Sequence, residues 1–188
     1  MLQLFVFLGN PGKEYEKTRH NVAWRTAECL SFYASLAWQE KFKGRCASTP
    51  VPSGRLVLLM PQTFMNLSGE CVRACMDFFK MEAGELLVIH DEVELPFGTI
   101  SFREGGGLGG HNGLKSIRKN LGTDGFWRFR IGVGRPERGD VSSHVLGRFS
   151  PVEESLLNTY LEKAANILLE CAADPTAAAA AYGKTPIF

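Results

Sequence analysis

The chain opens with the apolar run Leu2-Gln-Leu-Phe-Val-Phe-Leu8, and the turn sequence Gly9-Asn10-Pro11-Gly12 follows it at once. A short apolar run that stops at a glycine-proline turn is typical of a buried strand. Runs of the same kind are found at Leu56–Met60 and at Leu86–Ile89. The sequence therefore predicts three buried strands along the first half of the chain.

Segments with helical periodicity lie between and after these strands. Apolar residues recur at helical spacing at positions 24, 27, 30, 34 and 37, at positions 72, 75, 76 and 79, and along positions 156–171. Two more strands are predicted at 99–103 and 128–133, with a short basic helix near 113–121 between them. Asp174-Pro175 is expected to begin a last helix. Because strands alternate with helices, the predicted fold class is α/β.

Length and composition limit the number of domains. The chain has 188 residues, and 45% of them are hydrophobic. This is enough for one domain with a sizeable core and too little for two, so we expect a single domain over residues 1–188. No apolar run approaches the length of a transmembrane helix, and the opening run is too short for a secretory signal, so we expect no membrane partner.

Charge is unevenly distributed along a chain whose net charge is only +1. Between Arg103 and Arg138 there are eight lysine or arginine residues and three acidic ones, whereas the segment from Ser150 onwards has two lysines and five acidic residues. A basic stretch beside an acidic helix indicates a surface that binds a polyanion on one side. An ordinary solvated charged face is the alternative.

The five cysteines form no CxxC motif. We interpret them as reduced thiols in the core of a cytoplasmic protein. Cys71 and Cys75 are four residues apart and would lie on one helical face, so a metal-binding pair is the alternative. No histidine or further cysteine lies near them in the sequence.

Polar residues with little structural use follow the predicted strands. Asn10 follows the first strand, Asn66 the second, Asp91 ends the third, and His111-Asn112 come after the glycine-rich turn that follows the fourth. Ligand sites of α/β sheets form beyond the strand ends, so these residues are candidates for one site. Several asparagines would hold amides, carbonyls and a water without adding charge, which favours acyl-transfer chemistry.

Each of these residues also has a purely structural interpretation. Asn10 lies in ordinary turn sequence. Asn66 or Ser68 could instead cap the helix that follows them, and Asn112 could cap the short basic helix. Asp91 could pair with a lysine.

Of the four histidines, His20 is the candidate general base, because it lies outside any apolar run and just before a predicted helix. A histidine base needs its second ring nitrogen bonded to an orienting group, normally a carboxylate. His90 and Asp91 are neighbours at a strand end, so their side chains point to opposite faces and Asp91 is expected to serve His20. This pair predicts direct attack by a histidine-activated water, with no serine or cysteine nucleophile required.

The segment Gly105-Gly106-Gly107-Leu108-Gly109-Gly110 satisfies GxGxxG and raises a nucleotide-dependent oxidoreductase as an alternative. A dinucleotide site would need a carboxylate at the end of the next strand. That strand ends at Val133-Gly134-Arg135-Pro136, and the first acid after it is Glu137. We therefore interpret the segment as a loop that lets an RNA or peptide backbone approach closely.

Six segments together resemble the bacterial type of peptidyl-tRNA hydrolase along nearly the whole chain. They are, in order, Asn10-Pro11-Gly12 with Tyr15 and Thr18-Arg19-His20-Asn21; Phe64-Met65-Asn66 with Ser68-Gly69; Asp91-Glu92 with Leu95-Pro96 and Gly98; Gly109-Gly110-His111-Asn112-Gly113-Leu114; Phe129-Arg130-Ile131-Gly132-Val133-Gly134-Arg135-Pro136; and Val145-Leu146 with Phe149. Their order and spacing make the resemblance specific. Leu108 stands where many relatives carry a polar residue or histidine, and Ala23 replaces a frequent glycine, but no chemical position is substituted.

The resemblance implies a mixed β-sheet surrounded by helices, in an enzyme that acts as a monomer without cofactor or metal. The reaction would be hydrolysis of the ester between a peptide and the 3′ end of tRNA, which recycles tRNA from stalled or aborted translation. His20 would be the base, Asp91 would stabilise and orient it, and Asn10 would distinguish peptidyl from unblocked aminoacyl substrates. Contacts to the tRNA end and the peptide would come from Tyr15, Phe64, Met65, Asn66 and Asn112, and Arg103 with Arg130 would grip a tRNA phosphate. A scaffold of the same fold that binds RNA without catalysis is a second alternative, and the presence of His20 and Asp91 speaks against it.

Overall fold

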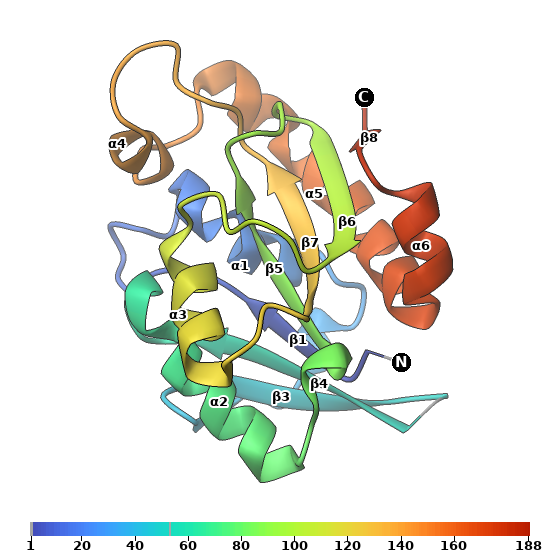
Figure 1. Cartoon of the computed structure of the whole chain (residues 1–188). Helices are drawn as coiled ribbons and strands as arrows, with labels where there is room; N and C mark the ends of the chain where they lie inside the picture. Colours follow the sequence, from blue (N-terminus) through green and yellow to red (C-terminus); the bar gives the residue numbers. More distant parts are fainter. Residues whose placement is uncertain (1, 53) are drawn as a thin grey trace.

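Figure 1 shows the computed structural model of the protein, which describes residues 2–52 and 54–188. One eight-stranded sheet has the strand order β2-β3-β4-β1-β5-β7-β6-β8. The strands are β1 (Leu4–Phe7), β2 (Gln39–Lys41), β3 (Gly44–Val51), β4 (Gly54–Pro61), β5 (Leu86–Glu92), β6 (Thr99–Glu104), β7 (Trp127–Gly132) and β8 (Thr185–Pro186). The helices are α1 (Val22–Glu28), α2 (Ser68–Phe79), α3 (Asn112–Leu121), α4 (Val141–Val145), α5 (Pro151–Ala173) and α6 (Pro175–Ala181).

The sheet is mixed, as the resemblance implies. β4, β1, β5 and β7 run parallel, whereas β2, β3, β6 and β8 join it in antiparallel pairs. β1 lies between β4 and β5, and all four of its residues are buried, which confirms the strand predicted from the opening apolar run. The carboxyl ends of the four parallel strands meet at one edge of the sheet, where α/β proteins bind ligands.

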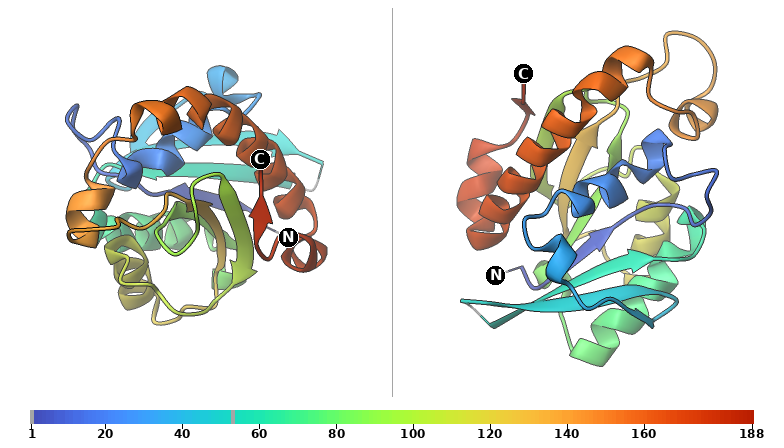
Figure 2. Two further views of the ribbon diagram at one scale, coloured as in Figure 1. Left: turned by 90° about the horizontal axis from the view of Figure 1, so that it is seen from above. Right: turned by 180° about the vertical axis from the view of Figure 1, so that it is seen from behind.

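Helices cover both faces of the sheet. Phe5 and Phe7 pack into the core beneath α1 and α5, and the alternate residues Leu4 and Val6 pack into the core beneath α2 and α3. The right-hand view of Figure 2 shows α1 and α5 on one side of the sheet, and Figure 1 shows α2 and α3 on the other. The layers confirm the predicted α/β class.

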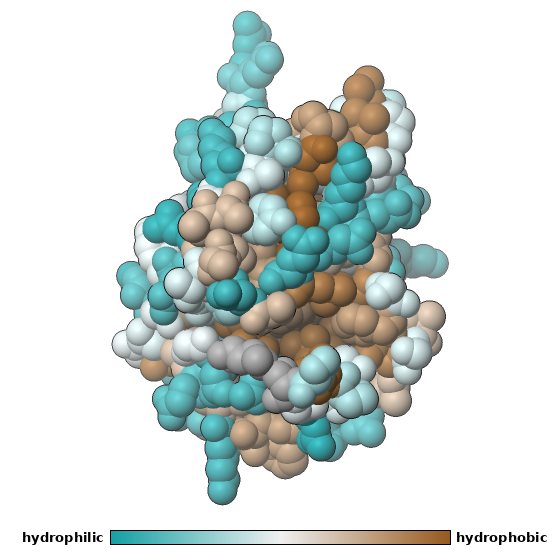
Figure 3. Space-filling view, turned by 90° about the vertical axis from the view of Figure 1, so that its right-hand side faces the viewer, coloured by the Kyte–Doolittle hydropathy of each residue, from teal (hydrophilic) through white to brown (hydrophobic). Residues whose placement is uncertain are grey.

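Apolar side chains reach the surface at the sheet edge that β8 and α6 close, and this is the side seen in Figure 3. Phe188 is 55% exposed, and its ring lies 5.9 Å from that of Tyr160 and 6.1 Å from that of Phe97. The aromatic contacts hold Phe188 against α5 and against the loop between β5 and β6. Within residues 2–52 and 54–188, no helix combines the length and the apolar composition needed to cross a bilayer.

Most predicted helices are present, but the first is shorter than expected. The stripe at positions 24–37 predicts one long helix, whereas α1 ends at Glu28 and only the 3₁₀ turn Tyr33–Ser35 follows. The bonds from the Leu30 amide to the Ala27 carbonyl and from the Tyr33 amide to the Leu30 carbonyl span three residues. A spacing of three residues fits a 3₁₀ turn as well as an α-helix, so the stripe did not distinguish them.

The hairpin of β2 and β3 was not predicted. Its turn residues Phe42 and Lys43 have φ angles of 58° and 59°, the left-handed conformation that a two-residue hairpin turn requires. Asparagine and glycine usually fill such a turn, and Phe-Lys carries no such signal. β2 is exposed along its length, so it also lacks the apolar run that revealed the inner strands.

Gly69 allows α2 and α3 to pack closely. A Cβ atom at this position would lie 2.1 Å from the Ser116 carbonyl oxygen on α3. We expect Gly69→Ala to lower the free energy of unfolding by about 1–3 kcal/mol, because backbone must move to accommodate the methyl group. Urea denaturation measures this change. Gly84→Ala is the control, since a Cβ there meets nothing within 4 Å and its stability should not fall; equal losses in both variants would contradict the packing argument.

Candidate active site

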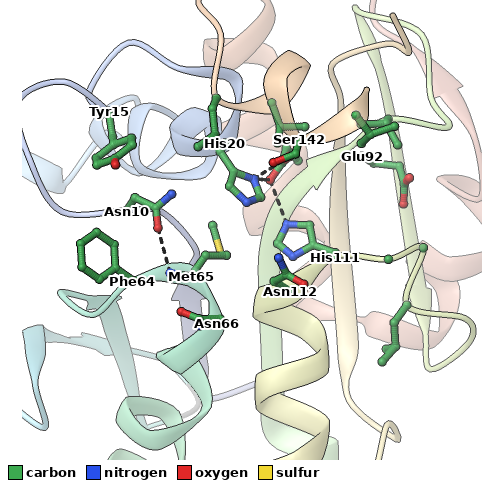
Figure 4. A pocket seen from close by; sticks show the side chains of 18 of the residues that line it. Asn10, Tyr15, His20, Phe64, Met65, Asn66, Glu92, His111, Asn112 and Ser142 are labelled. Carbon is green, nitrogen blue, oxygen red and sulfur yellow. Dashed lines mark hydrogen bonds and ion pairs between the residues drawn. The ribbon is translucent and has the colours of Figure 1, made fainter. Parts of the chain in front are cut away.

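A cavity of about 830 Å³ opens at the edge of the sheet where β1 and β5 end (Figure 4). The predicted residues that line it are Asn10, Tyr15, His20, Phe64, Met65, Asn66, Asp91 and Asn112. Segments far apart in the sequence therefore converge as the strand-end argument predicts. Arg103 and Arg130 are the two predicted site residues that are absent from its walls.

His20 and Asp91 form the pair that the sequence predicts. His20 lies in the 3₁₀ turn Arg19–Asn21, directly before α1, and Asp91 is near the end of β5. The Nδ1 atom of His20 is 2.9 Å from each carboxylate oxygen of Asp91. Both contacts use Nδ1, which leaves Nε2 as the ring nitrogen available to a water or a substrate. Both side chains are buried, since His20 is 8% and Asp91 is 3% exposed.

His111 is a second histidine on the same carboxylate, and its role was not predicted. Its Nε2 lies 2.9 Å from Oδ1 of Asp91, and its Nδ1 accepts a hydrogen bond of 3.2 Å from the Gly113 amide. Because Nδ1 is an acceptor, the proton of neutral His111 is on Nε2 and is donated to Asp91. The same acceptor makes His111 the N-cap of α3. The sequence feature that could have indicated this role is the position of His111 directly after a glycine-rich turn.

His90 lies on the other face of β5 from Asp91, as predicted, and its Nδ1 is 2.7 Å from the backbone carbonyl oxygen of Asp91. Its ring packs edge-on against that of His111, 5.0 Å away. Burial, followed by the nearby His111, lowers the pKa of His90 well below its ordinary value. A neutral His90 therefore fills space behind the pair without adding charge.

The pKa values of His20 and Asp91 are shifted by burial and by the charges of neighbouring groups. Burial alone would lower the pKa of His20, but the negative charge and hydrogen bond of Asp91 outweigh it, and the pKa is raised. Burial would raise the pKa of Asp91, yet His20 and His111 together hold it well below its ordinary value. Asp91 is thus a carboxylate that favours the protonated form of His20.

The side chain of Asn10 is fixed in one orientation. Its Oδ1 accepts a hydrogen bond of 2.8 Å from the Met65 amide, and its backbone is bonded in both directions by Asn21. With Oδ1 occupied, the Nδ2 group is the part of Asn10 that remains to donate into the cavity (Figure 4). Asn21, which was in the family-like motif without an assigned role, is the residue that holds the turn.

Asn66 and Asn112 are exposed at the cavity, and their structural interpretations as helix caps are wrong. The N-cap of α2 is Leu67, which makes no side-chain cap, and the N-cap of α3 is His111. Their amides are therefore free for a ligand. Phe64, which also lines the cavity, is 56% exposed beside them.

Three arginines share one face of β6 and β7, next to the glycine-rich segment. Arg130 donates from Nε and Nη2 to Oε2 of Glu92, each at 2.9 Å, so it is already ion-paired. Arg103 is exposed. Arg128, which was not predicted, is 2% exposed and donates from Nη1 to the Gly107 carbonyl oxygen at 2.8 Å. Burial, followed by the positive charges of Arg103 and Arg130, lowers the pKa of Arg128 to about 10.

A histidine oriented by a buried carboxylate and facing an open cavity lined with amide side chains is an arrangement suited to hydrolysis. The sequence pattern of the family described as Peptidyl-tRNA hydrolase matches residues 4–186. The chain is 50% identical over 157 residues to the peptidyl-tRNA hydrolase of Treponema pallidum, covering 81% of this chain and 78% of that one. It is 40% identical over 175 residues to that of Listeria welshimeri, covering 93% and 95%.

Solved structures agree with the sequence relatives. The crystal structure of peptidyl-tRNA hydrolase from Acinetobacter baumannii superimposes with a TM-score of 0.85 at 34% identity, covering 97% of this chain and 96% of that one. The chain belongs to the peptidyl-tRNA hydrolase family. The resemblance carried by the six sequence segments is confirmed, and the oxidoreductase alternative finds no support among these relatives.

Proposed function

We propose that His20 is the general base with which this enzyme hydrolyses the ester between a peptide and the 3′ end of tRNA. The observation that carries the proposal is the orientation of the ring. Asp91 holds Nδ1 with both oxygens, so Nε2 faces the cavity with a free lone pair whenever His20 is neutral. The substrate and its chemistry are those of the family to which the chain belongs.

The proton balance of the reaction follows from this geometry. Nε2 of His20 takes a proton from water as the oxygen attacks the ester carbonyl carbon. Asp91 stabilises the imidazolium that forms. When the tetrahedral intermediate collapses, the same proton passes to the departing ribose oxygen, so the products are a peptide carboxylic acid and tRNA with a free hydroxyl group.

Three asparagines would bind the acyl part of the substrate. Asn10 presents a fixed NH₂ donor, which matches the carbonyl group of a peptide or another N-blocked amino acid. A free α-ammonium group offers no acceptor to this donor, so Asn10 would select peptidyl over unblocked aminoacyl substrates. Asn66 and Asn112 would donate to peptide carbonyls or to the developing oxyanion.

The aromatic rings near the cavity mouth would receive the tRNA end. Phe64 and Tyr15 suit stacking on the unpaired terminal adenine. Met65, which is buried behind them, would complete the wall and position Asn10 through its amide. We propose further that the enzyme acts as a monomer in the cytoplasm and needs no cofactor.

The experiment that tests the proposed activity compares two substrates. N-acetyl-aminoacyl-tRNA should be hydrolysed to tRNA and the N-acetylated amino acid, whereas the same tRNA with an unblocked amino acid should survive. Release of labelled amino acid into the acid-soluble fraction measures both. Equal hydrolysis of the two substrates, or of neither, would contradict the proposal.

The asparagines can be tested by changes that keep shape and remove a donor. Asn66→Asp and Asn112→Asp are each expected to lower kcat/KM about 10²-fold or more, because a carboxylate cannot donate to a carbonyl or an oxyanion. Initial rates with N-blocked aminoacyl-tRNA measure the loss. Asn158→Asp, on the exposed face of α5, is the control and should keep its activity. Full activity in both cavity variants would show that these amides do not bind the substrate.

Arg103 and Arg130 would bind a tRNA phosphate outside the cavity. Arg103→Ala should raise KM for full-length peptidyl-tRNA and flatten the slope of log K against log salt by about one unit or less. On a peptide ester of a short 3′ fragment it should be nearly normal. Arg73→Ala, which removes an exposed arginine from α2, controls for net charge.

Arg130 is paired with Glu92, so a variant that removes Arg130 alone also leaves the Glu92 carboxylate without its ion-pair partner. Arg130→Gln should be compared with the double variant in which Glu92 is also changed to glutamine. If Arg130 binds phosphate, both variants should be impaired on full-length substrate and nearly normal on the short fragment. An equal defect on both substrates would show that Arg130 acts near the ester or supports the fold.

A further inference from the structure

Two histidines and one carboxylate meet at a single point in the cavity wall. His20, Asp91 and His111 each offer one ligand atom, a ring nitrogen or a carboxylate oxygen, and these three atoms lie within 4.8 Å of one another. Each of the two ring nitrogens is 2.9 Å from Oδ1 of Asp91. Figure 4 shows the two imidazole rings approaching this point from different elements, the turn before α1 and the start of α3.

We propose that His20, Asp91 and His111 bind a zinc ion, and that zinc bound there inhibits the enzyme. The inhibition rests on the proposed role of His20, whereas the binding of zinc does not. The ion would act as a reversible regulator that competes with catalysis, since the proposed mechanism uses His20 and Asp91 without a metal.

The donor set and its geometry suit zinc. Two imidazole nitrogens and a carboxylate oxygen form a set that zinc binds in proteins, at about 2.0–2.2 Å, with a fourth position left to water. Ligand atoms around a tetrahedral ion at those distances are roughly 3.3 Å apart. The present separations of 2.9 Å need to open only slightly. Nitrogen ligands also disfavour Mg²⁺, which prefers oxygen donors and is bound through phosphates and waters.

Zinc would inhibit because it changes the tautomer of His20. In the free enzyme the proton of neutral His20 is on Nδ1, and Nε2 has the lone pair. A zinc ion on Nδ1 moves that proton to Nε2, with no change in oxidation state and no net loss of a proton. A protonated Nε2 cannot accept a proton from the attacking water, so hydrolysis stops at its first step.

The structure also limits the affinity. Zinc on Nε2 of His111 would move its proton to Nδ1, which now accepts the 3.2 Å hydrogen bond from the Gly113 amide. That bond would be lost, so the site is expected to exchange zinc with buffers and chelators.

Binding is tested directly by titrating Co²⁺ into the chelator-treated full chain and recording its visible absorption, which reports four-coordinate geometry, and then displacing it with Zn²⁺. We expect one ion per chain. His111→Gln should weaken binding at least about tenfold, because one of three ligands is lost. His144→Gln is the control, since His144 is not part of the cluster and should leave binding unchanged. Far-ultraviolet circular dichroism checks that both variants are folded.

Inhibition is tested with wild-type enzyme in buffered free zinc, using a 3′-fragment ester. The rate of hydrolysis should fall in parallel with zinc occupancy of the site, as determined by displacement of Co²⁺. The rate should recover fully when a chelator is added, and Mg²⁺ should not change it. Equal metal binding by the wild type and by His111→Gln would show that His111 is not a ligand, and would overturn the proposed zinc site. Activity that rises with zinc would overturn the inhibition and indicate a metal-activated water instead. Absence of hydrolysis by the chelator-treated wild type would overturn the proposed function while leaving the binding result intact.

Discussion

His20→Ala is expected to lower kcat/KM for peptidyl-tRNA about 10²–10⁴-fold, which is roughly 3–5 kcal/mol in the activation barrier. The loss arises because, among the described residues that line the cavity, no other ring nitrogen is free to accept the proton of the attacking water. His111 cannot substitute, since its Nε2 donates to Asp91 and its Nδ1 accepts from Gly113. The same loss should appear with full-length peptidyl-tRNA and with a short 3′-fragment ester, because both substrates contain the ester bond that is hydrolysed. Single-turnover rates on both substrates measure it.

The fold of the His20 variant should survive, since Asp91 keeps a hydrogen-bond donor in His111. Ser142→Ala provides the matched control in the same cavity wall. Direct attack by water predicts that Ser142→Ala hydrolyses the substrate at close to the wild-type rate. A loss as large as that of His20→Ala, together with a trapped acyl-enzyme, would show that a serine is the nucleophile and that the mechanism is wrong.

Asp91→Asn is expected to be impaired to a similar degree, about 10²–10⁴-fold, because the amide no longer stabilises the imidazolium of His20 as it forms. The pH profile separates this effect from a general loss of structure. Only neutral His20 can act as a base, so kcat/KM should fall as the pH drops through the pKa of His20. Asp91 raises that pKa and burial lowers it. Removing the negative charge leaves burial unopposed, so the acidic limb should move to lower pH in Asp91→Asn.

An acidic limb that stays at the same pH in Asp91→Asn would mean that another group controls the profile. Such a result would contradict the assignment of the acidic limb to His20.

The inner strands and the convergence of the site were predictable from sequence because they depend on simple patterns. The apolar runs that became β1, β4 and β5 are buried on both faces, and polar residues after such strands have to meet at one edge of the sheet. The pairing of His20 with Asp91 followed in part from the alternation of side chains along β5. That alternation excluded His90 as the partner of Asp91. The choice of His20 depended on its position outside any apolar run and just before a predicted helix, and the same reasoning missed His111 as a second partner.

Other features depend on tertiary contacts that leave little trace in the sequence. The tautomer of His111 is set by the Gly113 amide, and the orientation of Asn10 is set by the Met65 amide, two backbone groups that only the fold brings near. Arg128 looks like its neighbour Arg130 in the alternating strand pattern, yet one is buried under the Gly107 carbonyl and the other is ion-paired to Glu92. The hairpin of β2 and β3 was not predicted because its turn residues, Phe42 and Lys43, are unusual for a two-residue turn.

¹⁵N NMR of the His20 ring across a pH titration of the wild-type enzyme measures both its tautomer and its pKa. Neutral His20 should carry its proton on Nδ1 and have a bare Nε2. The pKa of the ring should lie above its ordinary value and coincide with the acidic limb of kcat/KM. A neutral ring protonated on Nε2, or a ring pKa that does not match the kinetic limb, would contradict the assignment of His20 as the general base.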